Sequence, residues 1–150
     1  MSVNLITRDE YPLSKSLITK LDEFLISILS SESIEDSNIN VSFISSEEMR
    51  ELNKQFRGID KDTNVLSFKN QDISKEHTKV LGDIAISYPY VVNEAIVSEK
   101  DLDSHISHMF IHGILHILGY DHENESEANN MEAKEIEFLS KFNIINPYAI

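Results

Sequence analysis

Histidines are concentrated in one short segment, and their spacing constrains the local fold more than any other feature of the sequence. Five of the six histidines fall within residues 105–122. His112 and His116 are four residues apart, so a helix through this segment places both imidazoles on one face, one turn apart. Gly119 can adopt the positive φ that ends a helix sharply, and the returning chain can bring His122 to the same point. The sequence therefore predicts a helix followed by a tight turn at Gly119.

Three imidazoles at this spacing predict a metal site. Neutral imidazole nitrogens bind Zn²⁺ at about 2.0–2.1 Å, and three of them leave one tetrahedral position for water, as in catalytic zinc sites. Zinc, one ion per chain, is the expected metal, although copper and nickel bind similar ligands. The sequence contains no cysteine, which excludes thiolate ligands, disulfides and a cysteine nucleophile. We expect His112, His116 and His122 to be the ligands.

Other polar residues surround this predicted site. His108 could orient a ligand or a substrate group, whereas His105 is interpreted as a surface residue near the start of the helix. Asp121 could accept a hydrogen bond from the second ring nitrogen of a ligand. The acidic residues from Asp121 to Glu127 are interpreted as a solvated face that favours the N-terminus of the next helix.

The residue that follows His112 distinguishes this segment from the zinc proteases. Those enzymes have Glu directly after the first histidine, where it acts as general base on the metal-bound water. Here the position is Gly113, which disfavours peptide hydrolysis. A bound metal could still lower the pKa of its water towards ~7 or polarise a phosphoryl oxygen. The general base would then be His108, a metal-bound hydroxide or the substrate itself.

Apolar patterning predicts an α+β fold, because helices and strands are mixed without a regular βαβα alternation. We expect one small domain over residues 1–150, with a mixed sheet of about four strands packed with helices, one of them a metzincin-like zinc helix. Met131 and Phe138 are predicted core residues. The expected strands are residues 2–7, 39–43, 65–68 and 80–87, and the expected helices lie at about residues 13–28, 46–57, 89–96, 102–118 and 128–139.

Charge is distributed unevenly along the chain. There are 13 basic and 26 acidic residues, a net charge of −13, yet residues 50–79 contain seven basic residues against five acidic ones. Because Lys and Arg drive phosphate binding, the net charge argues against a protein coated with nucleic acid. The basic segment is either a solvated loop or a place where phosphate is held. No apolar run reaches the about 20 residues of a membrane span, and no signal peptide is apparent, so we expect a cytoplasmic protein.

Three motifs resemble those of the YbeY family, endoribonucleases of ribosomal RNA maturation. The segment from His112 to His122 is similar to the family signature HGxLHxxGYDH. Arg57 to Phe68 is similar to a family block that ends in VLSF, and Leu81 to Ile84 is similar to LGDI. Motif order and spacing also agree, so the resemblance covers nearly the whole chain. One departure is Lys69, where the family often has Pro.

The resemblance implies a zinc-dependent, single-strand-specific endoribonuclease. Its expected roles are ribosomal RNA processing, including maturation of the 3′ end of the small-subunit RNA, and ribosome quality control. It implies zinc at His112, His116 and His122, and a functional arginine at Arg57, whose guanidinium can hold a phosphate bidentately. The expected partner is ribosomal RNA or the ribosome, reached through a basic ribosomal protein, with no DNA and no membrane. Without the resemblance, Arg57 is more simply a surface cation at a helix end.

Two other functions are compatible with the same residues. The acidic net charge favours a non-catalytic ribosome-assembly factor in which the zinc is structural. A metal-dependent hydrolase of another, smaller substrate would use the same three histidines. Cleavage of RNA by the folded protein distinguishes the proposed nuclease from both.

Overall fold

The computed structural model describes residues 1–34, 36–70 and 79–149, and within them every strand and helix expected from the sequence is present. Lys75, one of the cations counted in the basic segment, lies outside the described residues. None of the described helices is long and apolar enough to cross a membrane. The elements are β1 (Ser2–Ile6), α1 (Lys15–Ser31), β2 (Asn38–Ile44), α2 (Ser46–Arg57), β3 (Val65–Lys69), β4 (Val80–Ser87), α4 (Tyr88–Val97), α5 (Leu102–Ile117) and α6 (Glu125–Ser140).

The four strands form one mixed sheet in the order β1-β2-β4-β3. The pairs β1–β2 and β2–β4 are parallel, whereas β3 is antiparallel to β4, with Val65 opposite Ile86 and Lys69 opposite Gly82. This arrangement confirms the predicted α+β class and mixed sheet. β3 is an edge strand, so one side of its backbone faces away from the sheet.

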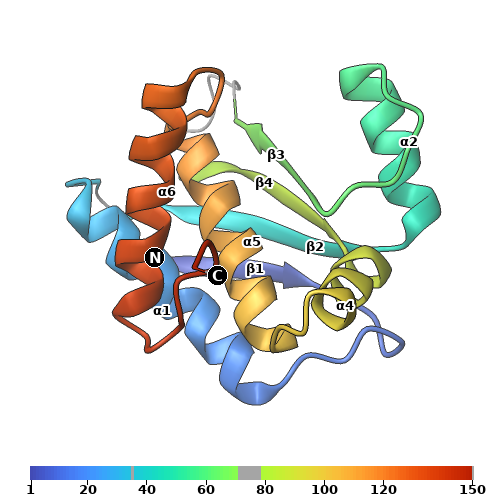
Figure 1. Ribbon diagram of the computed structural model, residues 1–150, viewed down its shortest axis with the longest axis horizontal. Helices are drawn as coiled ribbons and strands as arrows, with labels where there is room; N and C mark the ends of the chain where they lie inside the picture. The colour runs from blue at the N-terminus through green and yellow to red at the C-terminus, as the bar shows by residue number, and fades with distance from the viewer. Residues whose placement is uncertain (35, 71–78, 150) are drawn as a thin grey trace.

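Two groups of buried side chains hold helices on opposite faces of the sheet. In β4, Ile84 and Ile86 belong to the main core under α1, α5 and α6, whereas Ala85 belongs to a smaller group under α2. Because successive residues of a strand point to opposite faces, α2 and α5 lie on different sides of the sheet. The main core contains Met131 and Phe138, as predicted. Figure 1 shows α1, α5 and α6 together in front of the sheet and α2 apart from them.

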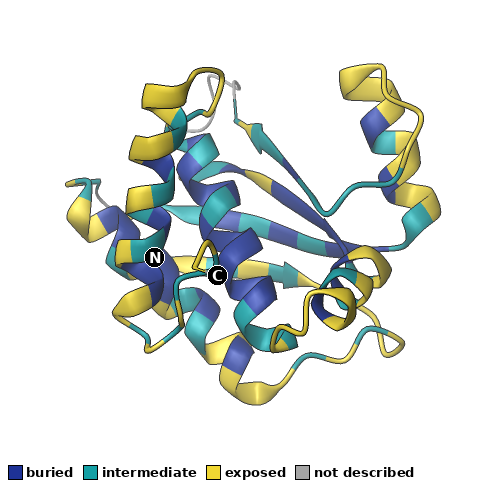
Figure 2. Cartoon of the chain, in the orientation of Figure 1, coloured by how far each residue is buried: buried dark blue, intermediate teal, exposed yellow. Residues whose placement is uncertain are grey.

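α2 presents most of its surface to solvent, as Figure 2 shows. Ser45 and Glu48 form a capping box, in which each side chain accepts a hydrogen bond from the other residue's backbone N–H. The helix ends at Arg57, followed by Gly58 with a φ of 70°. These two signals fix both ends of α2, and its last residue stands where the chain turns back toward β3.

α5 is almost completely buried along its length. Asp101 caps its N-terminus by accepting a hydrogen bond from the Ser104 N–H. Just beyond its C-terminus, Gly119 has a φ of 104°, a conformation that is strained for residues with a Cβ. The chain therefore reverses at the predicted residue.

Gly113 allows α5 to lie close to β3 and β4. A Cβ on this residue would stand 2.9 Å from Cδ1 of Ile84 and 3.0 Å from Oγ of Ser67. Both distances are shorter than ordinary van der Waals contact, and Ile84 is itself buried. The absence of a side chain at this position thus sets the distance between the histidine helix and the edge strand.

Candidate metal centre

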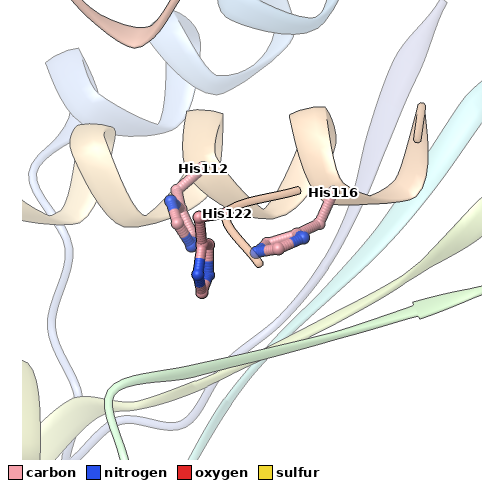
Figure 3. A group of neighbouring side chains, drawn as sticks. All are labelled: His112, His116 and His122. Carbon is pink, nitrogen blue, oxygen red and sulfur yellow. The ribbon is translucent and has the colours of Figure 1, made fainter. Parts of the chain in front are cut away.

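The structure brings His112, His116 and His122 together. His112 and His116 project from one side of α5, and His122 follows the turn at Gly119. One ring nitrogen from each lies within 4.8 Å of the other two. Figure 3 shows the three rings converging in the space between α5 and β3. This group could hold one metal ion.

The surroundings of His116 favour the neutral imidazole that coordinates metals. Burial lowers the pKa of His116, and the neighbouring rings of His112 and His122 lower it further. A hydrogen bond to the Tyr120 backbone and the nearby Asp121 carboxylate act in the opposite direction but are outweighed. A set of three adjacent imidazoles fits a divalent cation such as zinc, because imidazole nitrogen is among its usual ligands.

Glu135 on α6 supports the candidate ligand His112. Its Oε1 lies 2.5 Å from Nδ1 of His112, and the side chain is fully buried. Burial raises the pKa of Glu135, but hydrogen bonds from His108, His112 and Tyr148 outweigh it and lower the pKa to about 2. The carboxylate is therefore ionised and accepts the Nδ1 proton of His112. This leaves Nε2 of His112 as the nitrogen available to a metal.

Tyr148 and His108 complete the polar group around Glu135. The Tyr148 hydroxyl donates to Oε2 of Glu135 at 2.6 Å. Nε2 of His108 lies 3.2 Å from that hydroxyl and 3.4 Å from Oε1 of Glu135. Burial, together with the hydrogen bond to Glu135, raises the pKa of Tyr148, so the hydroxyl stays protonated as a donor. His108 thus contacts the carboxylate behind His112, and its ring also lies edge-on to that of His112, with centroids 6.4 Å apart.

The structure places His105 and Asp121 differently from what their positions in the sequence indicated. The interpretation of His105 as a surface residue is wrong: it is buried, with Nε2 3.0 Å from Oε1 of Glu94 on α4. Asp121 accepts a hydrogen bond from the backbone N–H of His122 at 2.8 Å, so it fixes the turn that carries this ligand. Asp121 also lies near the exposed Glu123 and Glu127, at the face interpreted as solvated.

Sequence reasoning missed the role of Glu135, although a signal was present. The apolar stripe of α6 contains Met131, Phe138 and Leu139, and Glu135 occupies the same face one turn after Met131. A carboxylate in a buried stripe needs a partner. That position alone indicated a buried cation or donor opposite α6.

A cleft of about 560 Å³ connects the three histidines to Arg57. Its lining includes Arg57 at the end of α2, the chain from Thr63 to Ser67, and the three rings. Arg57 is exposed, and no carboxylate forms an ion pair with it within the described ranges. The cleft therefore has three histidines on one side and a free guanidinium on the other.

Replacing Glu135 by Gln should weaken metal binding by about 10–100-fold, the usual effect of removing a residue that orients a histidine ligand. The amide keeps the shape of the carboxylate but loses its charge, so the Nδ1 proton of His112 is held less strongly. Zinc affinity, measured by competition with a chelator, tests this. Glu137→Gln, at an exposed position of the same helix, is the matched control and should bind zinc like the parent. Equal affinity in a folded Glu135→Gln protein would contradict the assigned role.

The fold and this cleft define a class of protein: a small α+β protein with a group of three histidines that could hold a metal ion, beside the edge strand of a mixed sheet. A family model described as Endoribonuclease YbeY matches residues 5–143. The chain belongs to this family, which confirms the resemblance drawn from its motifs.

The names of similar proteins agree with this family assignment. The chain is 39% identical to Endoribonuclease YbeY of Francisella tularensis subsp. novicida (strain U112), covering 99% of this chain and 93% of that protein. It is 38% identical to Endoribonuclease YbeY of Francisella tularensis subsp. tularensis (strain FSC 198), with 99% and 89% covered. Among solved structures, the solution structure of TM1509 from Thermotoga maritima has a TM-score of 0.61 and 29% identity, covering 94% of this chain and 91% of that one.

Proposed function

We propose that this protein is a zinc-dependent, single-strand-specific endoribonuclease. The observation that carries the proposal is the convergence of His112, His116 and His122 in one cleft with Arg57. Its relatives are named endoribonucleases, which supports RNA as the substrate. In this proposal the three histidines hold the metal and Arg57 holds the phosphate to be cut.

Glu135, the three histidines and Arg57 each have a role in this proposal. Glu135 keeps the Nδ1 proton on His112, so that Nε2 faces the metal position. A zinc ion held by the three histidines would supply Lewis acidity to a phosphoryl oxygen or to a water molecule. Arg57 would hold the non-bridging phosphate oxygens through two parallel N–H donors and stabilise the charge that develops there. Its freedom from ion pairs within the described residues leaves these donors available.

The dimensions of the cleft support an unpaired strand as substrate. Its volume of about 560 Å³ is that of a small-ligand pocket, which has room for a nucleotide or two. Single-stranded RNA can present its backbone and splayed bases to such a cleft. We therefore place a single phosphodiester between Arg57 and the three histidines.

The wider role follows from the family and the charge. We propose that residues 1–150 act as one domain in the cytoplasm, in processing of ribosomal RNA at the 3′ end of the small subunit and in ribosome quality control. A net charge of −13 opposes approach to bare RNA, so we propose that a basic ribosomal protein brings the enzyme to its substrate. Neither DNA nor a membrane takes part.

Arg57→Ala should lower RNA cleavage by about 10²–10³-fold, because one preorganised charge donor is lost, while one zinc per chain remains bound. Cleavage of a labelled single-stranded RNA and metal content by mass spectrometry test this on the same sample. Arg50→Ala is the matched control, since Arg50 pairs with Asp60 at 2.6 Å and does not line the cleft. Loss of zinc in the Arg57 variant would contradict its role.

The acidic charge keeps the ribosome-assembly factor as a second candidate. That function is favoured if zinc-loaded parent protein, freed of contaminating nucleases, cuts no RNA yet supports ribosome maturation. A folded His116→Ala protein that still supports maturation would favour it further, because the metal would then be dispensable for the role.

A further inference from the structure

A pair of aromatic rings, one of them exposed, lies at the end of α2 that reaches the cleft. Phe56, the penultimate residue of α2, and Phe68 of β3 have ring centroids 4.9 Å apart. Phe56 is 57% exposed, whereas Phe68 is partly buried against the small core under α2. Arg57, which follows Phe56, and Ser67, which precedes Phe68, both line the cleft. Phe68 points to the opposite face of the sheet from Ser67, so the aromatic pair lies around the edge strand from the three histidines. Phe68 thus holds Phe56 in place, and one face of this pair remains open to solvent.

Four exposed cations lie close to the aromatic pair in the sequence. Lys54, Arg57, Lys61 and Lys69 are all exposed, and none of them has an ion-pair partner in the part of the chain that the structure describes. The two acidic residues between them are engaged elsewhere. Asp60 pairs with Arg50, and Asp62 accepts hydrogen bonds from the Thr63 N–H and the Ser87 hydroxyl. Residues 54–69 contain these four cations and two carboxylates, one of which is paired with Arg50, so the local charge remains positive.

The opposite wall of the cleft is acidic. Asp121, Glu123 and Glu127 group together after α5, and the first two line the cleft. An anionic strand at the three histidines is repelled from this wall and attracted to the end of α2. The charge distribution therefore favours a path in which a bound strand leaves the three histidines toward the end of α2.

We propose that single-stranded RNA leaves the cleft over the end of α2, with one of its bases stacked on the open face of Phe56. The proposal rests on the proposed function, since it extends the path of the same substrate. Lys54, Lys61 and Lys69 would contact the neighbouring phosphates. Aromatic rings interleaved with unpaired cations are the usual means by which proteins hold single strands without reading their sequence. Phe56 is a positioning residue here: it fixes which phosphodiester reaches Arg57.

Two substitutions and two oligonucleotides test the stacking contact. Affinities are measured by fluorescence anisotropy of a labelled single-stranded RNA of about ten nucleotides, with the zinc-loaded protein and a check that the RNA remains intact. Phe56→Ala should weaken binding about tenfold, the scale of one base–aromatic stack. Moving an abasic site along the RNA should weaken binding by the parent about tenfold at one position. The Phe56→Ala protein should not distinguish that abasic RNA from the intact one.

Controls separate stacking from folding and from general apolar contact. Phe56→Tyr should restore the affinity, whereas Phe56→Leu should not, because only the ring stacks. Ile96→Ala, at an exposed apolar position on α4, should bind as the parent does. Equal affinity of the parent and Phe56→Ala, or independent losses from the substitution and every abasic site, would overturn the proposal. The first result would also be expected if the aromatic pair instead docked a protein.

The same samples distinguish this proposal from the proposed function. Zinc content and cleavage rate are recorded for each variant alongside RNA affinity. A parent that binds RNA with the Phe56-dependent base contact but cuts nothing leaves the stacking surface standing and overturns the nuclease. A parent that cuts RNA but shows no dependence on Phe56 overturns the stacking surface alone. A parent that binds no single-stranded RNA overturns both.

Discussion

His116→Ala protein should contain almost no zinc and should cut no RNA, while remaining folded. Small-protein zinc sites have binding free energies of about 10–16 kcal/mol. Removal of one of three protein ligands takes away roughly a third of this, so the affinity should fall by about 10²–10⁴-fold. His116 is only half-buried, and its loss leaves the core intact. Metal content by mass spectrometry and helix content by circular dichroism measure both parts of the prediction.

The matched control for this experiment is His105→Gln. His105 lies on the same helix but is buried toward Glu94 of α4, away from the other three rings. This variant should keep one zinc per chain, because no candidate ligand is changed. A folded His116→Ala protein with a full complement of zinc would remove the metal centre from the proposed mechanism.

Gly113→Glu should severely destabilise the fold and should not create a peptidase. The substitution supplies the residue that zinc proteases have after their first histidine, but the new Cβ would stand 2.9 Å from buried Ile84 and 3.0 Å from Ser67. Overpacking alone costs about 1–3 kcal/mol, and burying a carboxylate without a partner adds to this cost. Since small domains are stable by only about 5–15 kcal/mol, much of the stability is lost. Urea unfolding measures the change.

Two further variants define the cause of this loss. Gly113→Ala isolates the clash of the Cβ from the burial of charge; it should still destabilise the protein, despite the roughly 1 kcal/mol by which Ala favours a helix over Gly. Asn130→Glu, at an exposed position of α6, should change stability by less than about 0.5 kcal/mol. If Gly113→Glu were as stable as the parent, the glycine would not be what sets the spacing between α5 and β3.

Features governed by neighbouring residues could be predicted from the sequence. The four-residue spacing of His112 and His116 and the turn at Gly119 place the ligands, because helix geometry relates residues one turn apart. The cap at Ser45 and the stop at Gly58 define α2 by local hydrogen bonds and a local φ. In β2, Ile39, Val41 and Phe43 alternate with polar residues and are buried, as the two-residue period of a strand requires.

Features that join distant parts of the chain could not be predicted in this way. Glu135 reaches His112 only because α6 packs on α5, and Tyr148 reaches Glu135 from a segment beyond the last helix. His105 seemed a surface residue because its partner, Glu94, lies on another helix. The strand order β1-β2-β4-β3 depends likewise on long-range pairing. The position of Arg57 in the metal cleft follows from that order, since β3 at the edge carries the chain from α2 past α5.

The support for His112 also determines when, during synthesis of the chain, the candidate metal centre can be completed. Glu135 and Tyr148 both follow the histidine segment along the chain, and ribosomes add about 5–20 residues per second, beginning from the N-terminus. For about a second or longer, a nascent chain contains all three imidazoles but not the carboxylate and hydroxyl behind them. The candidate metal centre therefore acquires its full hydrogen bonding only after Tyr148 has been added and α6 has packed on α5.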